Sequence, residues 1–289
     1  MSAGFKTPRR PPSRHGHLQK LLDEYSKTHG IAPERIRRWM SMVTLIGALG
    51  RVQANDEPRF LTKGGVSIEL RLGLAARTTN DIDVVFRGNS DELLSALDEA
   101  FEEPYSGFEF RRKGEPEPIR DTGTQRLMLQ VSFKHRTWQT LTAEVASPEA
   151  DEIDLVPTAI SLADFNLESP KRVACLSLRY QVAQKIHAVT EKPSDGRLNL
   201  RHWDLIDLIL LRGLCGDGLP RVRDACVRTF ERRGTHDWPP TLDAPDAWQE
   251  PYRRDASELG PAVPGDVHSA AGVVAGFIAA IDAARSTPS

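Results

Sequence analysis

Cysteine, net charge and long apolar runs are all scarce in this sequence. Its three cysteines, Cys175, Cys215 and Cys226, match no zinc-binding spacing, and their odd number does not suit a disulfide framework. We therefore expect a reduced protein of the cytoplasm. Since no apolar stretch approaches the roughly 18 residues that span a bilayer, we expect no membrane partner.

Neither sign of charge is in clear excess, because the chain has 38 Lys and Arg residues and 40 Asp and Glu residues, for a formal net charge of -2. A nucleic-acid partner would therefore need a local basic patch. Residues 1–14 combine basic residues with prolines and lack the apolar segment of a signal peptide. We predict a disordered basic arm there, either a solvated tail or a contact for an anionic partner. Two other basic clusters are candidate RNA contacts or solvated faces: Arg35, Arg37 and Arg38, and Arg111, Arg112 and Lys113.

The pattern of apolar residues divides the chain into two lobes. Residues 15–165 mix helices and strands, which predicts an α/β (α+β) lobe with a mixed sheet. Residues 166–289 predict a mostly α-helical C-terminal lobe, so the fold class is bi-lobed. We expect helices at 17–26, 33–51, 66–72, 90–101, 176–191, 201–214, 219–233 and 266–285, strands at 59–62, 81–86, 105–113, 125–134 and 137–146, and irregular chain at 236–264.

Two aspartates on one predicted strand suggest metal-assisted phosphoryl-group transfer. Asp81 and Asp83 are two residues apart, so their side chains share a face of the strand. Magnesium ions that neutralise a triphosphate prefer carboxylate oxygens. Such a site usually has a third carboxylate, and Glu144 in a second extended segment is the candidate. Glu144 is equally compatible with an exposed charge at a strand edge.

A glycine pair precedes these aspartates and can hold phosphates. Gly64 and Gly65 lie between a short strand and a short helix, where backbone N–H groups can approach an anion. Ser67 adds a hydroxyl donor. Lys63 either reaches the phosphates or ends the strand in solvent.

Two arginines separate the glycine pair from the aspartates. Arg71 and Arg77 can each pair with a phosphate through two hydrogen bonds. The alternative for each is a salt bridge with a local acidic residue.

The second lobe carries charged residues on predicted apolar helices. Lys185 lies beside the apolar stripe of its helix, where it is either a phosphate-binding cation or a surface lysine. Asp204 and Asp207 are three residues apart and share a helix face with Arg201. Because apolar residues surround these acids, they need buried partners, and Lys185 or Arg201 would serve.

Several of these segments together resemble the AbiEii/MenT group of nucleotidyltransferase toxins, of the DNA-polymerase-β-type superfamily and type IV-like toxin–antitoxin systems. In the first lobe they are KGGVSIELR at 63–71 and RTTNDID at 77–83. In the second they are QVAQKIHAVT at 181–190, RHWDLIDL at 201–208 and WPP at 238–240. The resemblance covers most of the chain from about residue 15. One departure is Thr79, where the family commonly has serine; the hydroxyl is kept, so we expect activity to survive.

The resemblance implies a metal-dependent nucleotidyltransferase that adds nucleotides from a nucleoside triphosphate to the 3′ end of tRNA. This addition would block aminoacylation and inhibit translation, and a cognate antitoxin would restrain the toxin. Mg²⁺ is the implied cofactor, in a two-metal site or with Mn²⁺ in its place. Lys185 and Asp207 match the family's functional lysine and acid. The residues and the resemblance together predict this set: catalytic Asp81, Asp83, Lys185, Asp207 and Glu144; metal-binding Asp81, Asp83 and Glu144; nucleotide-binding Lys63, Gly64, Gly65, Ser67, Arg71, Arg77 and Thr79; and supporting Arg201 and Asp204.

Two alternatives remain open. The same site can transfer nucleotides to a protein or small-molecule acceptor, because the fold does not choose the acceptor. The chain can also be an inactive nucleotidyltransferase-like binding module, although its acidic residues are intact. From the sequence we further expect Asp81, Asp83, Lys185 and Asp207 to converge on one surface.

Overall fold

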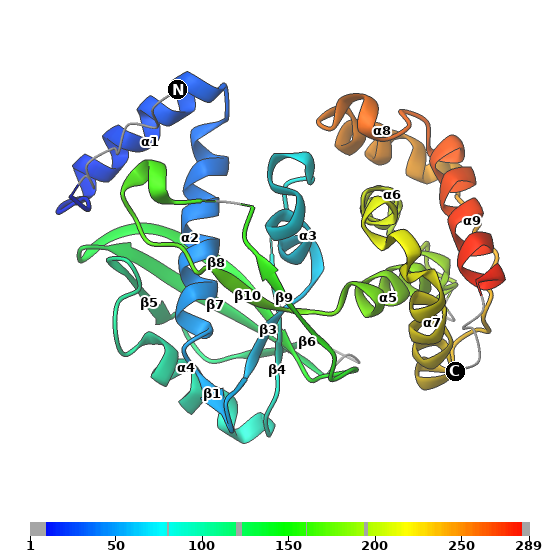
Figure 1. Ribbon diagram of the computed structural model, residues 1–289, viewed down its shortest axis with the longest axis horizontal. Helices are drawn as coiled ribbons and strands as arrows, with labels where there is room; N and C mark the ends of the chain where they lie inside the picture. The colour runs from blue at the N-terminus through cyan, green and yellow to red at the C-terminus, as the bar shows by residue number, and fades with distance from the viewer. Residues whose placement is uncertain (1–9, 80, 120–122, 160, 194–195, 285–289) are drawn as a thin grey trace. The chain divides into compact units, whose positions relative to one another are not determined.

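The computed structural model describes residues 10–79, 81–119, 123–159, 161–193 and 196–284. The chain folds into two compact units (Figure 1). Unit 1 comprises Met1–Arg71, Thr78–Pro148 and Leu155–Cys175, and unit 2 comprises Leu72–Arg77, Glu149–Asp154 and Leu176–Ser289. Most of the predicted basic arm, residues 1–9, lies outside the described residues, and the predicted lobe boundary at residue 165 stays a prediction.

Unit 1 is built on a mixed sheet in the order β5-β7-β8-β4-β3-β10-β9, with β6 paired to β7. β4 runs parallel to β8 and β3 parallel to β10, while β3–β4, β5–β7 and β7–β8 are antiparallel. This arrangement confirms the predicted fold class for the first lobe. The strands are β3 Phe60–Thr62, β4 Ile82–Phe86, β5 Phe108–Arg112, β6 Glu117–Ile119, β7 Thr124–Phe133, β8 Arg136–Ala146, β9 Ile153–Pro157 and β10 Arg172–Leu176, with a separate small pair, β1 Gln53–Ala54 and β2 Glu57–Pro58.

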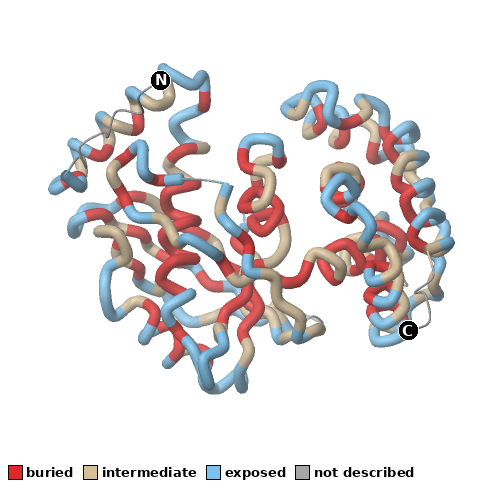
Figure 2. Tube along the Cα trace, in the orientation of Figure 1, coloured by how far each residue is buried: buried red, intermediate tan, exposed pale blue. Residues whose placement is uncertain are grey.

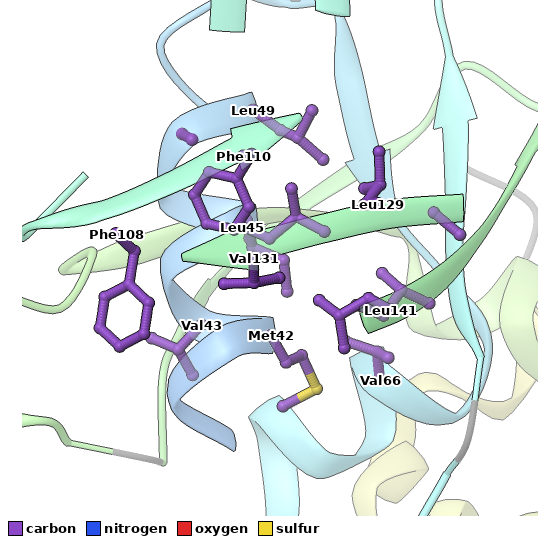
Figure 3. Close-up of a cluster of buried hydrophobic side chains, with 14 of the residues drawn as sticks. Met42, Val43, Leu45, Leu49, Val66, Phe108, Phe110, Leu129, Val131 and Leu141 are labelled. Atoms are coloured by element: carbon purple, nitrogen blue, oxygen red, sulfur yellow. The ribbon is translucent and has the colours of Figure 1, made fainter. Parts of the chain in front are cut away.

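The core of unit 1 lies between helix α2 and one face of the sheet. In β7 the residues Leu127, Leu129, Val131 and Phe133 are buried and alternate with more exposed ones, as a strand with one covered face requires. Figure 3 shows Leu129 and Val131 of β7 close to side chains of α2, such as Leu45. Figure 2 shows that α2 is buried along most of its length. The helices of unit 1 are α1 His15–His29, α2 Pro33–Leu49, α3 Gly64–Leu72 and α4 Leu93–Phe101.

Unit 2 is helical, as predicted. Helix α5 packs against α6 and α7, and α6 also packs against α9. The helices are α5 Leu178–Thr190, α6 His202–Cys215, α7 Leu219–Arg233, α8 Gln249–Ser257 and α9 Val267–Ala283. Within the described part of the chain, no helix is both long and apolar enough to cross a membrane.

Helix α8 lies in the stretch that we predicted to be irregular, so that prediction was wrong. Pro251 occupies its first turn, where a missing N–H breaks no hydrogen bond of the helix. Trp248 and Tyr252 are fully buried and fix the segment to its unit. Tertiary burial of two aromatic side chains therefore outweighs the abundance of proline in this stretch.

Three strands of the sheet, β6, β9 and β10, also lie where strands were not expected. β10 pairs with β3 so that Cys175 faces Thr62, and Val173 and Cys175 are buried. A buried strand of five residues leaves no periodic signal that separates it from a connection. The extended conformation of β10 is instead fixed by its parallel pairing with β3, more than 100 residues earlier in the chain.

Candidate active site

Two aspartates stand at the start of β4. Asp81 directly precedes the strand and is exposed, whereas Asp83 lies within it and is half-buried. Ile82 and Val84, on either side of Asp83, belong to the hydrophobic core. Because side chains alternate along a strand, Asp83 faces away from that core, and Asp81, two residues earlier, falls on the same side.

Glu144 lies on the neighbouring strand, beside Asp83. Strands β4 and β8 are parallel, with the Cα of Asp83 opposite that of Glu144, so both side chains belong to one face of the sheet. On the other side of Glu144, the Arg126 guanidinium of β7 donates to Oε1 of Glu144 from Nη2 at 2.8 Å. This hydrogen bond raises the pKa of Arg126. An exposed ion pair of this kind is weak, so it leaves Glu144 able to change partners.

The oxygen atoms of Asp81, Asp83 and Glu144 suit a magnesium ion. In the part of the chain that the structure describes, no three His, Cys, Asp or Glu side chains are grouped closely enough to hold a metal ion. Magnesium, however, is usually held by one or two protein carboxylates together with substrate phosphates and water. Asp81, Asp83 and Glu144 offer oxygen atoms alone on adjacent strands, which fits that requirement.

The glycine pair begins α3 and lies directly against the aspartate strand. Gly64 adopts a positive φ of 61°, and a side chain on it would collide with the carboxylate of Asp83. A Cβ on Gly65 would lie 2.7 Å from Oγ1 of Thr79. The Lys63 N–H donates to the carbonyl of Asp83 at 2.9 Å. The predicted phosphate turn and the predicted metal ligands are therefore neighbours within unit 1.

The other residues predicted to bind nucleotide have different surroundings. Ser67 is fully buried within α3, and Arg71 is half-buried in its last turn. Their contacts with a nucleotide stay predictions.

Unit 2 holds a compact group of four charged side chains. Nζ of Lys185 lies 2.6 Å from Oδ1 of Asp204 and 2.7 Å from Oδ2 of Asp207. Arg77 forms two hydrogen bonds with Asp207, from Nε to Oδ1 and from Nη2 to Oδ2, both 2.8 Å long. Two cations thus balance two carboxylates, and we call these four residues the charged quartet.

The charged quartet is held away from water. Asp207 is fully buried and Asp204 nearly so, among the apolar residues of α6. Burial alone would raise the pKa of Asp207, but the charges of Lys185 and Arg77 lower it below its ordinary value. Burial likewise disfavours the charged Lys185, and the two aspartates raise its pKa above the ordinary value. Arg201 is half-exposed and lies 3.9 Å from Asp204, so it contributes little to this neutralisation.

The basic clusters considered as RNA contacts are partly engaged within unit 1. Arg37 lies over the ring of Trp138, at 4.2 Å from its centroid, and donates to Gln19. Arg112 forms an ion pair with Asp98 at 3.0 Å. These two arginines therefore have partners within unit 1, and contacts of the two clusters with RNA stay predictions.

His187, on α5 close to Lys185, has a structural environment. Its ring is buried and lies within hydrogen-bond distance of Arg233 and Thr235. Burial and the charge of Arg233 lower the pKa of His187 to about 4, which leaves the ring neutral near pH 7.

Three contacts around the candidate site were not foreseen from the sequence. Arg77 pairs with Asp207, 130 residues away, whereas we had weighed only a local acidic partner. Arg126 pairs with Glu144, and Glu69 accepts a hydrogen bond from the backbone of Thr79. The sequence offered two signals: the polar Arg126 in an alternating strand, and the acids Asp207 and Glu69 within apolar helices. Neither signal identifies a partner.

Comparison with known proteins supports the resemblance drawn from the sequence. The family model "Nucleotidyl transferase AbiEii toxin, Type IV TA system" matches residues 47–282. A solved structure of MenT4, a nucleotidyltransferase toxin from Mycobacterium tuberculosis H37Rv, is similar to this chain with a TM-score of 0.51 and 17% sequence identity; the match covers 93% of this chain and 99% of MenT4. No curated protein matches the chain. Since the family model covers most of its length, the chain belongs to the AbiEii family of nucleotidyltransferase toxins.

Proposed function

We propose that this protein is a cytoplasmic toxin that transfers nucleotides from a nucleoside triphosphate to the 3′ acceptor end of tRNA. Addition to that end blocks aminoacylation and so inhibits translation. The observation that carries the proposal is the placement of Asp83 beside both Glu144 and the glycine start of α3. Carboxylates beside a turn that accommodates anions are what triphosphate chemistry requires.

Asp81 and Asp83, with Glu144, are the residues that would hold Mg²⁺, or Mn²⁺ in its place. The bound ion would neutralise the triphosphate and lower the barrier to displacement at phosphorus. The backbone N–H groups at the start of α3 bind phosphate oxygens, since the helix N-terminus favours negative charge. In unit 2, Lys185 is the proposed phosphate-binding cation, and Asp204 and Asp207 fix its position.

The transfer itself is a displacement at the α-phosphorus. The 3′ hydroxyl oxygen of the acceptor forms a bond to this phosphorus, the bond to the bridging oxygen of the β-phosphate breaks, and pyrophosphate leaves. We assign acceptance of the hydroxyl proton to the carboxylate of Glu144. Its exposed pairing with Arg126 suits that role, because the carboxylate can leave the arginine at small cost when the substrate arrives.

The decisive experiment incubates the purified protein with total tRNA, Mg²⁺ and each of the four nucleoside triphosphates, followed by sequencing of the tRNA 3′ ends. We expect added nucleotides with at least one triphosphate, and their loss in Asp83→Asn, which keeps the size of the side chain. Absence of addition with all four triphosphates would overturn the proposal. Label that survives ribonuclease but not protease would instead indicate a protein acceptor.

An inactive binding module is separated from an enzyme by toxicity in cells. Expression of the wild-type chain should arrest growth, and Asp81→Ala should relieve the arrest at equal protein level. Full toxicity of Asp81→Ala would favour a binding module.

A cognate antitoxin is the remaining proposed partner. The family model is that of a toxin from a toxin–antitoxin system, which supports a partner encoded beside this chain. Co-expression of the neighbouring gene should restore growth. Sequencing of the tRNA 3′ ends from those cells should then show whether the antitoxin neutralises the toxin or repairs its product.

A further inference from the structure

Helix α3 carries a buried carboxylate that no step of the proposed reaction uses. The side chain of Glu69 is completely excluded from solvent. Its Oε1 accepts a hydrogen bond from the backbone N–H of Thr79 at 2.9 Å. Thr79 precedes Asp81 by two residues, so this bond ties α3 to the chain just before the first predicted metal ligand.

Thr79 is held by α3 at two points on one helix face. Gly65 and Glu69 are four residues apart and so lie one above the other on the helix. The absent side chain of Gly65 leaves room for the side chain of Thr79, since a Cβ there would come within 2.7 Å of it. The carboxylate of Glu69 then binds the Thr79 amide. One contact fixes the side chain and the other fixes the backbone.

Burial of a carboxylate costs free energy, and an uncharged acceptor could accept the same hydrogen bond from the Thr79 amide. Burial raises the pKa of Glu69, and the Thr79 N–H, Arg35 and Arg38 counteract that rise. An apolar side chain of similar volume at such a position is often neutral or stabilising for the fold. The hydrogen bond to the Thr79 N–H is the contact that an apolar side chain at this position would lose.

Arg38 of α2 adds a positive charge to the surroundings of Glu69. It is half-buried, and burial lowers its pKa, while the charges of Glu69 and Asp81 act against that lowering. Loss of Glu69 would release the backbone N–H of Thr79, two residues before Asp81.

We propose that Glu69 is a positioning residue, which holds the Thr79 amide and thereby fixes Asp81 for cation binding. The inference rests on the proposed function, since it assigns Asp81 to a metal site. Glu69 does not touch the nucleotide or the metal. Its effect is transmitted through the Thr79 hydrogen bond, so an amide oxygen at the same place should replace it.

The test compares Glu69→Gln, which keeps an acceptor oxygen, with Glu69→Met, which keeps length and apolar volume but removes it. Mn²⁺ binding to the full chain, measured by electron paramagnetic resonance, should weaken by about tenfold or more in Glu69→Met and by less than about threefold in Glu69→Gln. Exchange of the Thr79 amide with deuterium should accelerate by about tenfold in Glu69→Met, as loss of one hydrogen bond predicts. Ile68→Val, a neighbouring buried substitution on α3, is the control and should leave both values unchanged.

Equal weakening of Mn²⁺ binding in Glu69→Gln and Glu69→Met would overturn the proposal, because charge and not the acceptor would then matter. Unchanged binding in Glu69→Met would also overturn it. If Glu69→Met fails to fold, Glu69→Ala replaces it in both measurements, and wild-type-like Thr79 exchange in any folded variant without the acceptor counts against the proposal. If the wild-type chain binds no Mn²⁺, the proposed metal-dependent function fails, whereas Thr79 exchange still reports whether Glu69 holds this amide.

Discussion

Replacement of Asp207 by alanine should strongly destabilise unit 2. In the charged quartet, Asp207 accepts two hydrogen bonds from Arg77 and one from Lys185 while completely excluded from solvent. Its removal leaves these two buried cations facing Asp204 alone, with one positive charge uncompensated. Breaking a buried ion pair by removal of one partner costs about 3–5 kcal/mol. We expect the free energy of unfolding to fall by that amount.

Urea denaturation followed by tryptophan fluorescence measures this change, because Trp203 lies on the same helix as Asp207. Glu231→Ala, an exposed substitution on α7, is the control and should change the free energy of unfolding by less than about 0.5 kcal/mol. The double variant Lys185→Met/Asp207→Ala restores a balance of one cation and one anion. It should recover about 1–3 kcal/mol relative to Asp207→Ala. A loss below about 1 kcal/mol in Asp207→Ala would refute a dry, tightly coupled quartet.

The same quartet gives stability a defined pH window. The pKa of Asp207 is lowered by folding, so its contribution is present above its unfolded value near 3.8 and is lost as the pH falls through the folded value. The pKa of Lys185 is raised by folding, so its contribution is present below its unfolded value near 10.5 and is lost as the pH rises through the folded value. The melting temperature, measured as a function of pH, should therefore be constant between about pH 3.8 and pH 10.5 and fall outside that range. In Asp207→Ala the pH range of constant melting temperature should be narrower or absent.

Three further predictions concern single sites. Gly65→Ala should destabilise unit 1 by about 1–3 kcal/mol in urea denaturation, because the new Cβ collides with Thr79, whereas Gly213→Ala, with open space on α6, should stabilise unit 2 by about 0.5–1 kcal/mol. In an NMR titration His187 should change protonation at about pH 4, and a midpoint near 6.5 would contradict its burial; because this pKa is lowered by folding, the associated stability is present above pH 6.5 and lost as the pH falls toward 4. All three cysteines are buried, and burial raises the pKa of Cys215 to about 11, so a thiol reagent at pH 8 should label the native chain far more slowly than the denatured chain; rapid native labelling would contradict this burial.

The elements β3, α3 and β4 were the most predictable part of the molecule. Its strand, glycine turn, short helix and second strand follow from local patterns, since Gly64 needs a positive φ and β4 alternates buried and less buried residues. Helices α5, α6, α7 and α9 of unit 2 were predictable for the same reason, because apolar periodicity over a dozen or more residues identifies an amphipathic helix, whereas the shorter α8 was missed.

Contacts between distant segments were not predictable from these patterns. The sequence indicated that Asp207 needed a buried cation, yet it gave no reason to choose Arg77, 130 residues away. It offered Glu144 as a third carboxylate, but its partner Arg126 follows from the register of β7 on β8. Register and long-range pairing depend on the assembled sheet, whereas composition and periodicity describe a single element at a time.

The two groups of carboxylates differ in a way that separates their roles. Asp204 and Asp207 are buried and matched by Lys185 and Arg77, so a divalent cation would have to displace two hydrogen-bonded cations from a dry site. In unit 1, Asp81 is exposed and the ion pair of Glu144 with Arg126 is weak, so a divalent cation can reach these carboxylates at small cost. We therefore expect Asp83→Asn to abolish Mn²⁺ binding and Asp204→Asn to lower stability while Mn²⁺ affinity changes by less than about threefold. The opposite pattern in a binding titration would move the metal site to unit 2.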